Sequence, residues 1–78
     1  MTTWRRGDYV EHMKYTDVYW RVEHVLRGCA HLRLVGAADA GRLYFYASQH
    51  ALKSEMILDV EYLKTPSNPL ALLAVVSR

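Results

Sequence analysis

The chain has 78 residues, which is enough for one small domain and too few for a second. Hydrophobic residues make up 51% of it and charged residues 23%, a composition that indicates a folded globular domain and excludes a disordered or low-complexity chain. Ten Lys and Arg against eight Asp and Glu leave a net charge of +2, too small to indicate nucleic-acid binding by itself. Cys29 is the only cysteine, so no intramolecular disulfide can form.

The sequence also predicts where in the cell the protein is located. No apolar region follows the charges of residues 1–8, so a signal peptide is not expected. The longest apolar run, residues 70–76, is far shorter than the roughly 20 residues of a membrane span. We therefore expect a cytoplasmic protein with no membrane contact, located in the host cytoplasm if a phage encodes it.

Residues 7–15 are the first predicted strand, and residues 16–18 are expected to turn the chain. Apolar residues fall on both parities of this strand, with Tyr9 and Met13 on one and Val10 on the other. A strand with such imperfect alternation is expected to be bent or bulged, as barrel strands often are.

Alternation of apolar and polar residues predicts three more strands before residue 48, over residues 19–27, 31–35 and 42–47. Gly28, Gly36 and Gly41 mark the turns between them. The dense Tyr and Phe residues of the last segment favour a strand over a helix. Residues 48–54 lack strand character and are expected to form a single helical turn.

Residues 56–63 alternate again and predict a fifth strand. A breaker segment follows, and within it Asn68 before Pro69 is typical of a helix N-cap followed by proline at the first helical position. Residues 70–76 are therefore expected to form a short C-terminal helix. The β-branched pair that ends this segment leaves a sixth strand as the alternative.

About five short strands joined mostly by tight turns predict an all-β fold, a small antiparallel barrel over residues 1–66. Residues 67–78 are then an apolar tail that packs on the barrel or on another subunit. His24 shares the inward parity of its strand and is expected to be buried. The predicted core consists of Val10, Trp20, Val22, Leu26, Leu32, Leu34, Leu43, Phe45, Leu58 and Val60.

The segment from Gly7 to Tyr15 resembles the opening strand of bacterial Tudor-like and KOW-like SH3 barrels, whose pattern is G-D-x-V-x-H-x-K-[FY]. The likeness extends over residues 4–63, with one departure, because residues 16–19 replace the usual glycine-rich turn. The resemblance implies an SH3-like fold and a non-enzymatic binding module of phage or bacterial origin. It also implies that the partner is nucleic acid or a protein of the transcription or repair machinery.

Arginine and tyrosine share the outward parity of the three middle strands, which would place them on one face of the sheet. Arginine binds phosphates and tyrosine rings stack on bases, so this face is a candidate site for nucleic acid or another partner. Cross-strand pairing on a solvated sheet and a homo-oligomer interface are the two alternatives. The candidate residues are Tyr19, Arg21, Arg33, Arg42, Tyr44 and Tyr46.

The apolar tail is the second candidate surface, because exposed hydrophobic residues of this density often mark association. A helical tail would place Leu70, Leu73 and Ala74 on one face that could cap the barrel, whereas an extended tail could pair with another subunit. The residues predicted to contact a second subunit are Leu70, Leu72, Leu73 and Val75.

No catalytic, metal or cofactor site is predicted. The only conceivable metal set consists of Cys29 with His12, His24, His31 and His50, and within this set only Cys29 and His31 lie close together in the sequence. A structural zinc site normally needs four ligands in paired short spacings. In a strand these two side chains would lie about 6–7 Å apart, too far for the direct hydrogen bond that a cysteine nucleophile needs. We therefore expect a protein that is not an enzyme.

Overall fold

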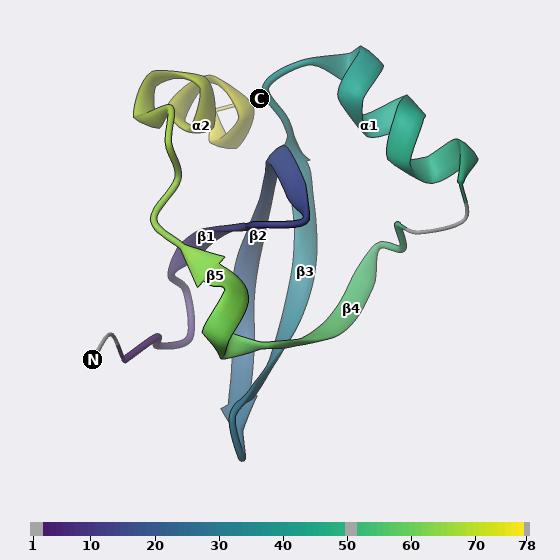
Figure 1. Ribbon diagram of the computed structural model, residues 1–78. Helices are drawn as coiled ribbons and strands as arrows, with labels where there is room; N and C mark the ends of the chain where they lie inside the picture. The colour runs from purple at the N-terminus through teal and green to yellow at the C-terminus, as the bar shows by residue number, and fades with distance from the viewer. Residues whose placement is uncertain (1–2, 50–51, 78) are drawn as a thin grey trace.

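Most of the backbone between Tyr9 and Lys64 belongs to one antiparallel sheet, with two short helices at one of its ends (Figure 1). The computed structural model describes residues 3–49 and 52–77. The sheet has five strands in the order β4-β3-β2-β1-β5 and is not closed, so the all-β prediction holds for the sheet but misses one of the two helices. The strands are β1 (Tyr9–His12), β2 (Tyr15–Leu26), β3 (Cys29–Ala37), β4 (Glu55–Asp59) and β5 (Leu63–Lys64).

The turn between β1 and β2 lies earlier than predicted. β1 ends at His12, and β2 begins at Tyr15, so the predicted turn at residues 16–18 is wrong. The His12 side chain closes the real turn, because its Nδ1 accepts a hydrogen bond from the Lys14 backbone N–H at 3.0 Å. The predicted irregularity of the first strand is confirmed by a register shift between Glu11 and His12.

The completely buried core side chains lie on β1, β2 and β3. Four predicted core residues, Val10, Trp20, Val22 and Leu32, are completely buried. The remaining core positions that pack against them are half-buried: Leu34, Leu43, Leu58 and Val60.

The predicted inward positions of Leu26 and His24 are wrong, since Leu26 is 60% exposed and His24 is also exposed. The β2–β3 hairpin projects beyond the rest of the sheet at the end opposite the helices (Figure 1), and the side chains of His24 and Leu26 remain in solvent there. Arg27 and Gly28 form this tip with φ angles of 52° and 79°. Such positive φ angles are typical of a tight hairpin turn.

The predicted strand over residues 42–47 is wrong, because this segment lies within helix α1 (Ala40–Ser48). Asp39 begins the helix as its N-cap, accepting a hydrogen bond from the Gly41 N–H at 2.8 Å. Leu43 and Tyr46, three residues apart, face the core, whereas Phe45 is 51% exposed rather than buried. The helical turn predicted over residues 48–54 includes residues 50–51, outside the described residues, and only Ser48 of its described part is helical.

The predicted fifth strand is divided into two strands by a short 3-10 helix, η1 (Val60–Tyr62). The Val60 N–H donates a hydrogen bond to the Gly28 carbonyl at 2.9 Å. The chain then turns through η1 into β5. β5 pairs with β1, with Leu63 opposite His12, so the last strand lies beside the first. The turn also leaves Tyr62 45% exposed.

The C-terminal segment forms helix α2 (Pro69–Val76), which confirms the helical alternative for the tail. Asn68 is its N-cap and accepts a hydrogen bond from the Ala71 N–H at 3.1 Å. The helix packs on β3 through Val75, which lies directly over Gly36. The predicted inward face is therefore wrong, because Leu70, Leu73 and Ala74 are exposed while Val75 is buried.

Candidate interaction surfaces

The structure brings together only two of the six predicted binding residues on the sheet. Arg21 and Arg33 lie opposite each other on β2 and β3, and both are exposed. Acidic side chains surround Arg33: its Nε lies 3.1 Å from Glu23 Oε1, and its Nη2 lies 3.6 Å from Glu55 Oε1. Arg33 is therefore engaged in cross-strand ion pairs, and cross-strand pairing was one of the alternatives to a binding surface.

The other arginine and two of the tyrosines lie on α1 instead of the sheet. Arg42 Nε lies 3.9 Å from Asp17 Oδ2, so this arginine is also near an acidic group. Tyr46 packs edge-on against Tyr15, with ring centroids 5.4 Å apart, and belongs to the edge of the core. Tyr44 is 78% exposed and is the one tyrosine of the predicted set that is fully accessible.

Tyr19 is completely buried, which contradicts its predicted place on the outer face. A register shift between Tyr19 and Trp20 interrupts the alternation of β2, so two successive residues can both be buried. The hydroxyl of Tyr19 has no hydrogen-bond partner among the described residues. Burial and the nearby carboxylates of Glu11 and Asp17 raise the pKa of Tyr19, which keeps it neutral.

Helix α2 exposes a row of apolar side chains to solvent. Leu70 is 79% exposed, Leu73 is 61% exposed and Val76 is 39% exposed, and they follow one another at a spacing of three residues. We call these three residues the α2 row. Two predicted contact residues, Leu70 and Leu73, belong to it, whereas Leu72 is half-buried and Val75 is buried against β3.

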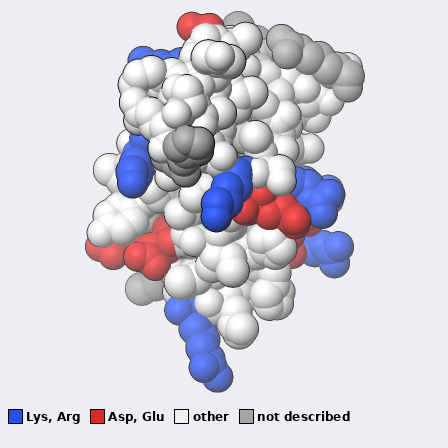
Figure 2. All heavy atoms as spheres, turned by 90° about the vertical axis from the view of Figure 1, so that its right-hand side faces the viewer, with Lys and Arg blue, Asp and Glu red and all other residues white. Residues whose placement is uncertain are grey.

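Charged side chains are sparse near the helices. Figure 2 shows lysine, arginine and acidic residues mostly across the middle and lower parts of this face, whereas the helical end above them is mostly uncharged. The sequence of α2, PLALLAVV, contains no charged residue at all. The surface of α2 therefore carries no charge of its own.

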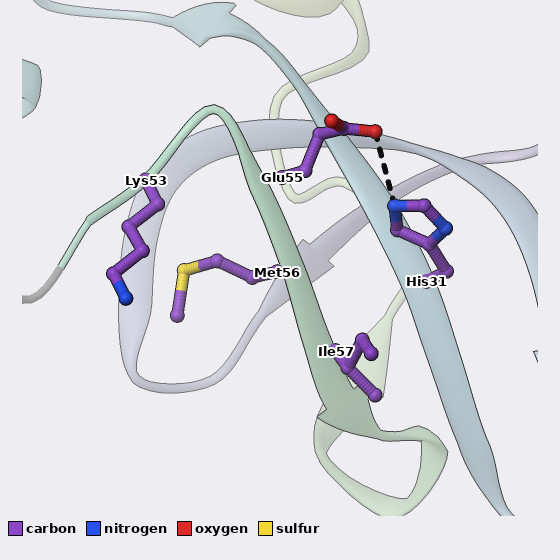
Figure 3. A pocket seen from close by; sticks show the side chains of 5 residues that line it. All are labelled: His31, Lys53, Glu55, Met56 and Ile57. Carbon is purple, nitrogen blue, oxygen red and sulfur yellow. Dashed lines mark hydrogen bonds and ion pairs between the residues drawn. The ribbon is translucent and has the colours of Figure 1, made fainter.

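A second accessible region surrounds β4, and the sequence analysis missed it. A hollow of about 390 Å³ is lined by side chains of β3, β4 and the segment before β4 (Figure 3). Ile57 is 72% exposed and borders both this hollow and a neighbouring one of about 250 Å³. The sequence did contain a signal, because Ile57 is an apolar residue on the outward parity of the predicted strand, between the acidic Glu55 and Asp59. The larger hollow is lined by His31, Lys53, Glu55, Met56 and Ile57.

Cys29 is not placed for nucleophilic catalysis. Its thiol donates a hydrogen bond to Asp59 Oδ1 at 3.4 Å, and this bond, burial and the Asp59 charge raise the pKa of Cys29. The reactive thiolate is therefore disfavoured. The ring of His31 is engaged elsewhere, since its Nε2 lies 3.1 Å from Glu55 Oε1. Within residues 3–49 and 52–77 no group of three or more His, Cys, Asp or Glu side chains could hold a metal ion.

A buried carboxylate, also missed by the sequence analysis, joins three segments of the chain. Glu11 is completely buried in β1. Its Oε2 accepts a hydrogen bond from the Asp17 N–H at 3.1 Å, and its Oε1 accepts from the N–H and the hydroxyl of Ser67, each at 3.0 Å. Burial alone would raise the pKa of Glu11, but the hydrogen bonds from Ser67 and Asp17, together with the Lys64 charge, lower it below its ordinary value. Glu11 is an ionised group that fixes the approach to α2.

Comparisons with known proteins assign no relative to this arrangement: no family model matches the chain, and no curated protein or solved structure gives a significant match. In the described part of the chain, neither helix has the length and apolar character needed to cross a membrane.

Proposed function

We propose that this protein is a non-enzymatic binding module with an SH3-like barrel fold, and that it acts by association with protein. The likeness of residues 4–63 to bacterial Tudor-like and KOW-like barrels supports the fold, as does the pairing of β5 with β1, which places the last strand beside the first. The single cysteine, with its protonated thiol, is compatible with a reducing cytoplasm.

The α2 row is the observation that carries the proposal. Burying a leucine side chain contributes roughly 1.5–3 kcal/mol, so leaving two of them in water on one short helix forgoes a large stabilisation. A row of this kind is typical of a surface that another protein covers. Because the helix has no charged residue to select among partners, we propose that a second copy of this chain covers it. The protein would then be a structural or oligomeric accessory protein whose tail makes the subunit contact.

Nucleic acid is the less favoured partner on electrostatic grounds. Arg33 lies between Glu23 and Glu55, and Arg42 lies beside Asp17, so two of the three arginines expected to bind phosphates already face acidic groups. The buried Tyr19 cannot stack on a base. The net charge of +2 adds little attraction for a polyanion.

Sedimentation equilibrium of the wild type and of Leu73→Glu tests the proposal. We expect the wild type to be a concentration-dependent dimer and Leu73→Glu to be a folded monomer, because the new charge cannot be buried in an apolar interface. Met13→Glu is a matched control, since Met13 has the same exposed fraction of 61% and lies in the β1–β2 turn rather than on α2. It should dimerise like the wild type.

A wild-type protein that stays monomeric at high concentration contradicts the proposal, and so does a dimer that Leu73→Glu leaves intact. Titration with single-stranded DNA, double-stranded DNA and RNA provides the complementary measurement. Binding that persists at physiological ionic strength and weakens steeply with added salt would assign the function to nucleic acid instead.

A further inference from the structure

We propose that β4 is a docking edge for an extended segment of another protein, which adds to the sheet as an antiparallel strand and carries basic residues on either side of a central apolar residue. This inference goes beyond the association through α2, because it depends on different residues.

The outer edge of β4 offers unpaired backbone groups to an incoming strand. β4 is an edge strand that pairs only with β3 among the described residues. Its register with β3 continues to the flanking bonds, in which Leu34 N–H donates to the Ser54 carbonyl and Val60 N–H donates to the Gly28 carbonyl, both within 2.9 Å. In an antiparallel pair the hydrogen-bonded positions alternate.

It follows that the even-numbered residues of β4 direct their N–H and C=O groups toward β3. The N–H and C=O groups of Glu55, Ile57 and Asp59 therefore point away from the sheet. An incoming strand would find three consecutive sets of backbone donors and acceptors, which is the arrangement used in recognition by strand addition.

The side chains of the same three residues provide a pattern that selects the partner. Figure 3 shows Glu55 and Ile57 on the side of β4 where His31 lies, while Met56 lies on the other side. Ile57 is 72% exposed, and the acidic residues stand two positions before and after it. An antiparallel strand places its central residue opposite Ile57 and its residues two positions away opposite Glu55 and Asp59. Glu55 Oε1 lies 3.1 Å from His31 Nε2 and 3.6 Å from Arg33 Nη2, but Glu55 Oε2 has no ion pair among the described residues. Asp59 accepts a hydrogen bond from the Cys29 thiol, which does not neutralise its charge. An apolar residue flanked by Lys or Arg at the positions opposite Glu55 and Asp59 therefore complements this surface.

The same pattern disfavours a second copy of β4 as the occupant. If two β4 strands paired about Ile57, Glu55 of each copy would lie opposite Asp59 of the other. Like charges directly opposite each other destabilise an antiparallel pair. Edge strands commonly carry charges that oppose self-pairing in this way. The charges of β4 thus oppose pairing with a second copy of β4 and favour pairing with a basic segment.

A labelled synthetic peptide, Thr-Lys-Val-Ile-Val-Lys-Thr, is the probe that tests the proposal by fluorescence anisotropy. We expect saturable binding to the wild-type protein, and about tenfold weaker binding of the peptide with Glu in place of both Lys. N-methylation of the central Ile removes a donor that faces β4 and should weaken binding about tenfold. N-methylation of a Val, whose N–H points away from β4, is the matched control and should have little effect.

Two protein variants locate the binding to β4. Ile57→Pro removes the outward N–H without removing a bond to β3, so the fold should survive, as circular dichroism would show, and binding should be lost. Glu55→Gln with Asp59→Asn should bind the Lys and Glu peptides almost equally. Glu61→Gln, an exposed acidic residue outside β4, should retain the preference for Lys.

Several results would overturn the proposal. They are the absence of saturable binding up to about 1 mM peptide, equal binding of the Lys and Glu peptides by the wild type, and equal weakening by the two N-methylated peptides. If Ile57→Pro instead abolished a dimer that Leu73→Glu left intact, β4 would pair with its own copy. These measurements are independent of the dimer through α2, so either proposal can fail alone.

Discussion

At the scale of single residues, Glu11 is the group on which the arrangement of the chain depends most. Its carboxylate bonds to Asp17 and to Ser67, which stands next to the N-cap of α2. We predict that Glu11→Gln destabilises the protein by about 2 kcal/mol, because an amide NH₂ then faces a backbone donor in a buried site. Urea unfolding measures this loss, and Glu61→Gln, an exposed carboxylate, is the control that should change little. An unchanged midpoint for Glu11→Gln would contradict the assigned role.

The ionisation of Glu11 also predicts how stability depends on pH. Its pKa in the folded protein is lower than the ordinary value of 4.5, so its contribution is complete above pH 4.5 and is lost as the pH falls through the folded pKa. Burial and Lys14 also lower the pKa of His12 below 6.5, so a separate loss begins as the pH falls below 6.5. Urea midpoints measured from pH 7 to pH 3 should fall in both windows. In Glu11→Gln the loss in the lower window should shrink and that in the upper window should remain.

Removing the Tyr19 hydroxyl is expected to change stability in the opposite direction from Glu11→Gln. Its hydroxyl is buried without a hydrogen-bond partner among the described residues, and such a group costs stability. We therefore expect Tyr19→Phe to leave the protein as stable as the wild type or to stabilise it by up to about 1 kcal/mol. Thermal unfolding at neutral pH measures the difference. A loss of more than about 1 kcal/mol would mean that the hydroxyl has a partner, such as an ordered water.

At the scale of secondary structure, the contact between α2 and β3 depends on Gly36. A Cβ atom at this position would lie 2.6 Å from Val75 Cγ1, closer than packed carbon atoms approach. We predict that Gly36→Ala destabilises the protein by about 1–3 kcal/mol through overpacking. Val75→Ala alone should cost about 1.5 kcal/mol of apolar burial. The double variant should lose clearly less than the sum, because the alanine methyl at position 36 occupies the space that Val75 leaves.

Val25→Ala is the control for this cycle, since Val25 is 36% exposed in the β2–β3 hairpin and does not belong to the α2 row. It should cost well under 1 kcal/mol. Strict additivity of the Gly36→Ala and Val75→Ala losses, measured by urea unfolding, would contradict the packing of α2 on β3. Additivity would also return the tail to its alternative role as a segment that packs only on another subunit.

Secondary structure and burial could be predicted from the sequence where only one local signal was present and no second signal conflicted with it. Alternation correctly predicted the burial of Trp20 and Val22, and the Asn68-Pro69 pair correctly predicted a helix start. In residues 42–47 two signals disagreed. The aromatic residues favoured a strand, whereas Asp39 offered an N-cap and Leu43 and Tyr46 had helical spacing. The capped helix formed, because strand preference depends on the neighbours that a segment meets.

Other features could not be read from local sequence at all. The partner of Glu11 is Ser67, 56 residues away, and no pattern near either residue reveals the bond. The register shift that buries Tyr19 beside Trp20 has no marker in the sequence, yet it moved one predicted binding residue into the core. The predicted Arg and Tyr surface depended on that parity and on the strand at residues 42–47. Both predictions are wrong, so the structure does not bring these residues together on one surface.

At the scale of the whole molecule, the two proposed surfaces lie at different parts of β3. α2 packs on Gly36, near the end of β3, whereas β4 pairs with β3 from Cys29 to Arg33. They also differ in character, because the α2 row is apolar and uncharged while β4 carries Glu55 and Asp59. The two proposals therefore assign assembly to one surface and recognition to the other.

This separation leads to a final prediction, which depends on both proposals. Sites that share no contacting residues usually act independently, with coupling of no more than about 0.5 kcal/mol. Leu73→Glu should therefore bind the Lys peptide within about twofold of the wild-type affinity, although it no longer dimerises. Conversely, Ile57→Pro should dimerise normally and fail to bind the peptide. Anisotropy titration and sedimentation equilibrium of both variants provide the four measurements. If Leu73→Glu lost peptide binding while remaining folded, the edge of β4 would be accessible to its partner only in the assembled protein, and the two surfaces would form one site.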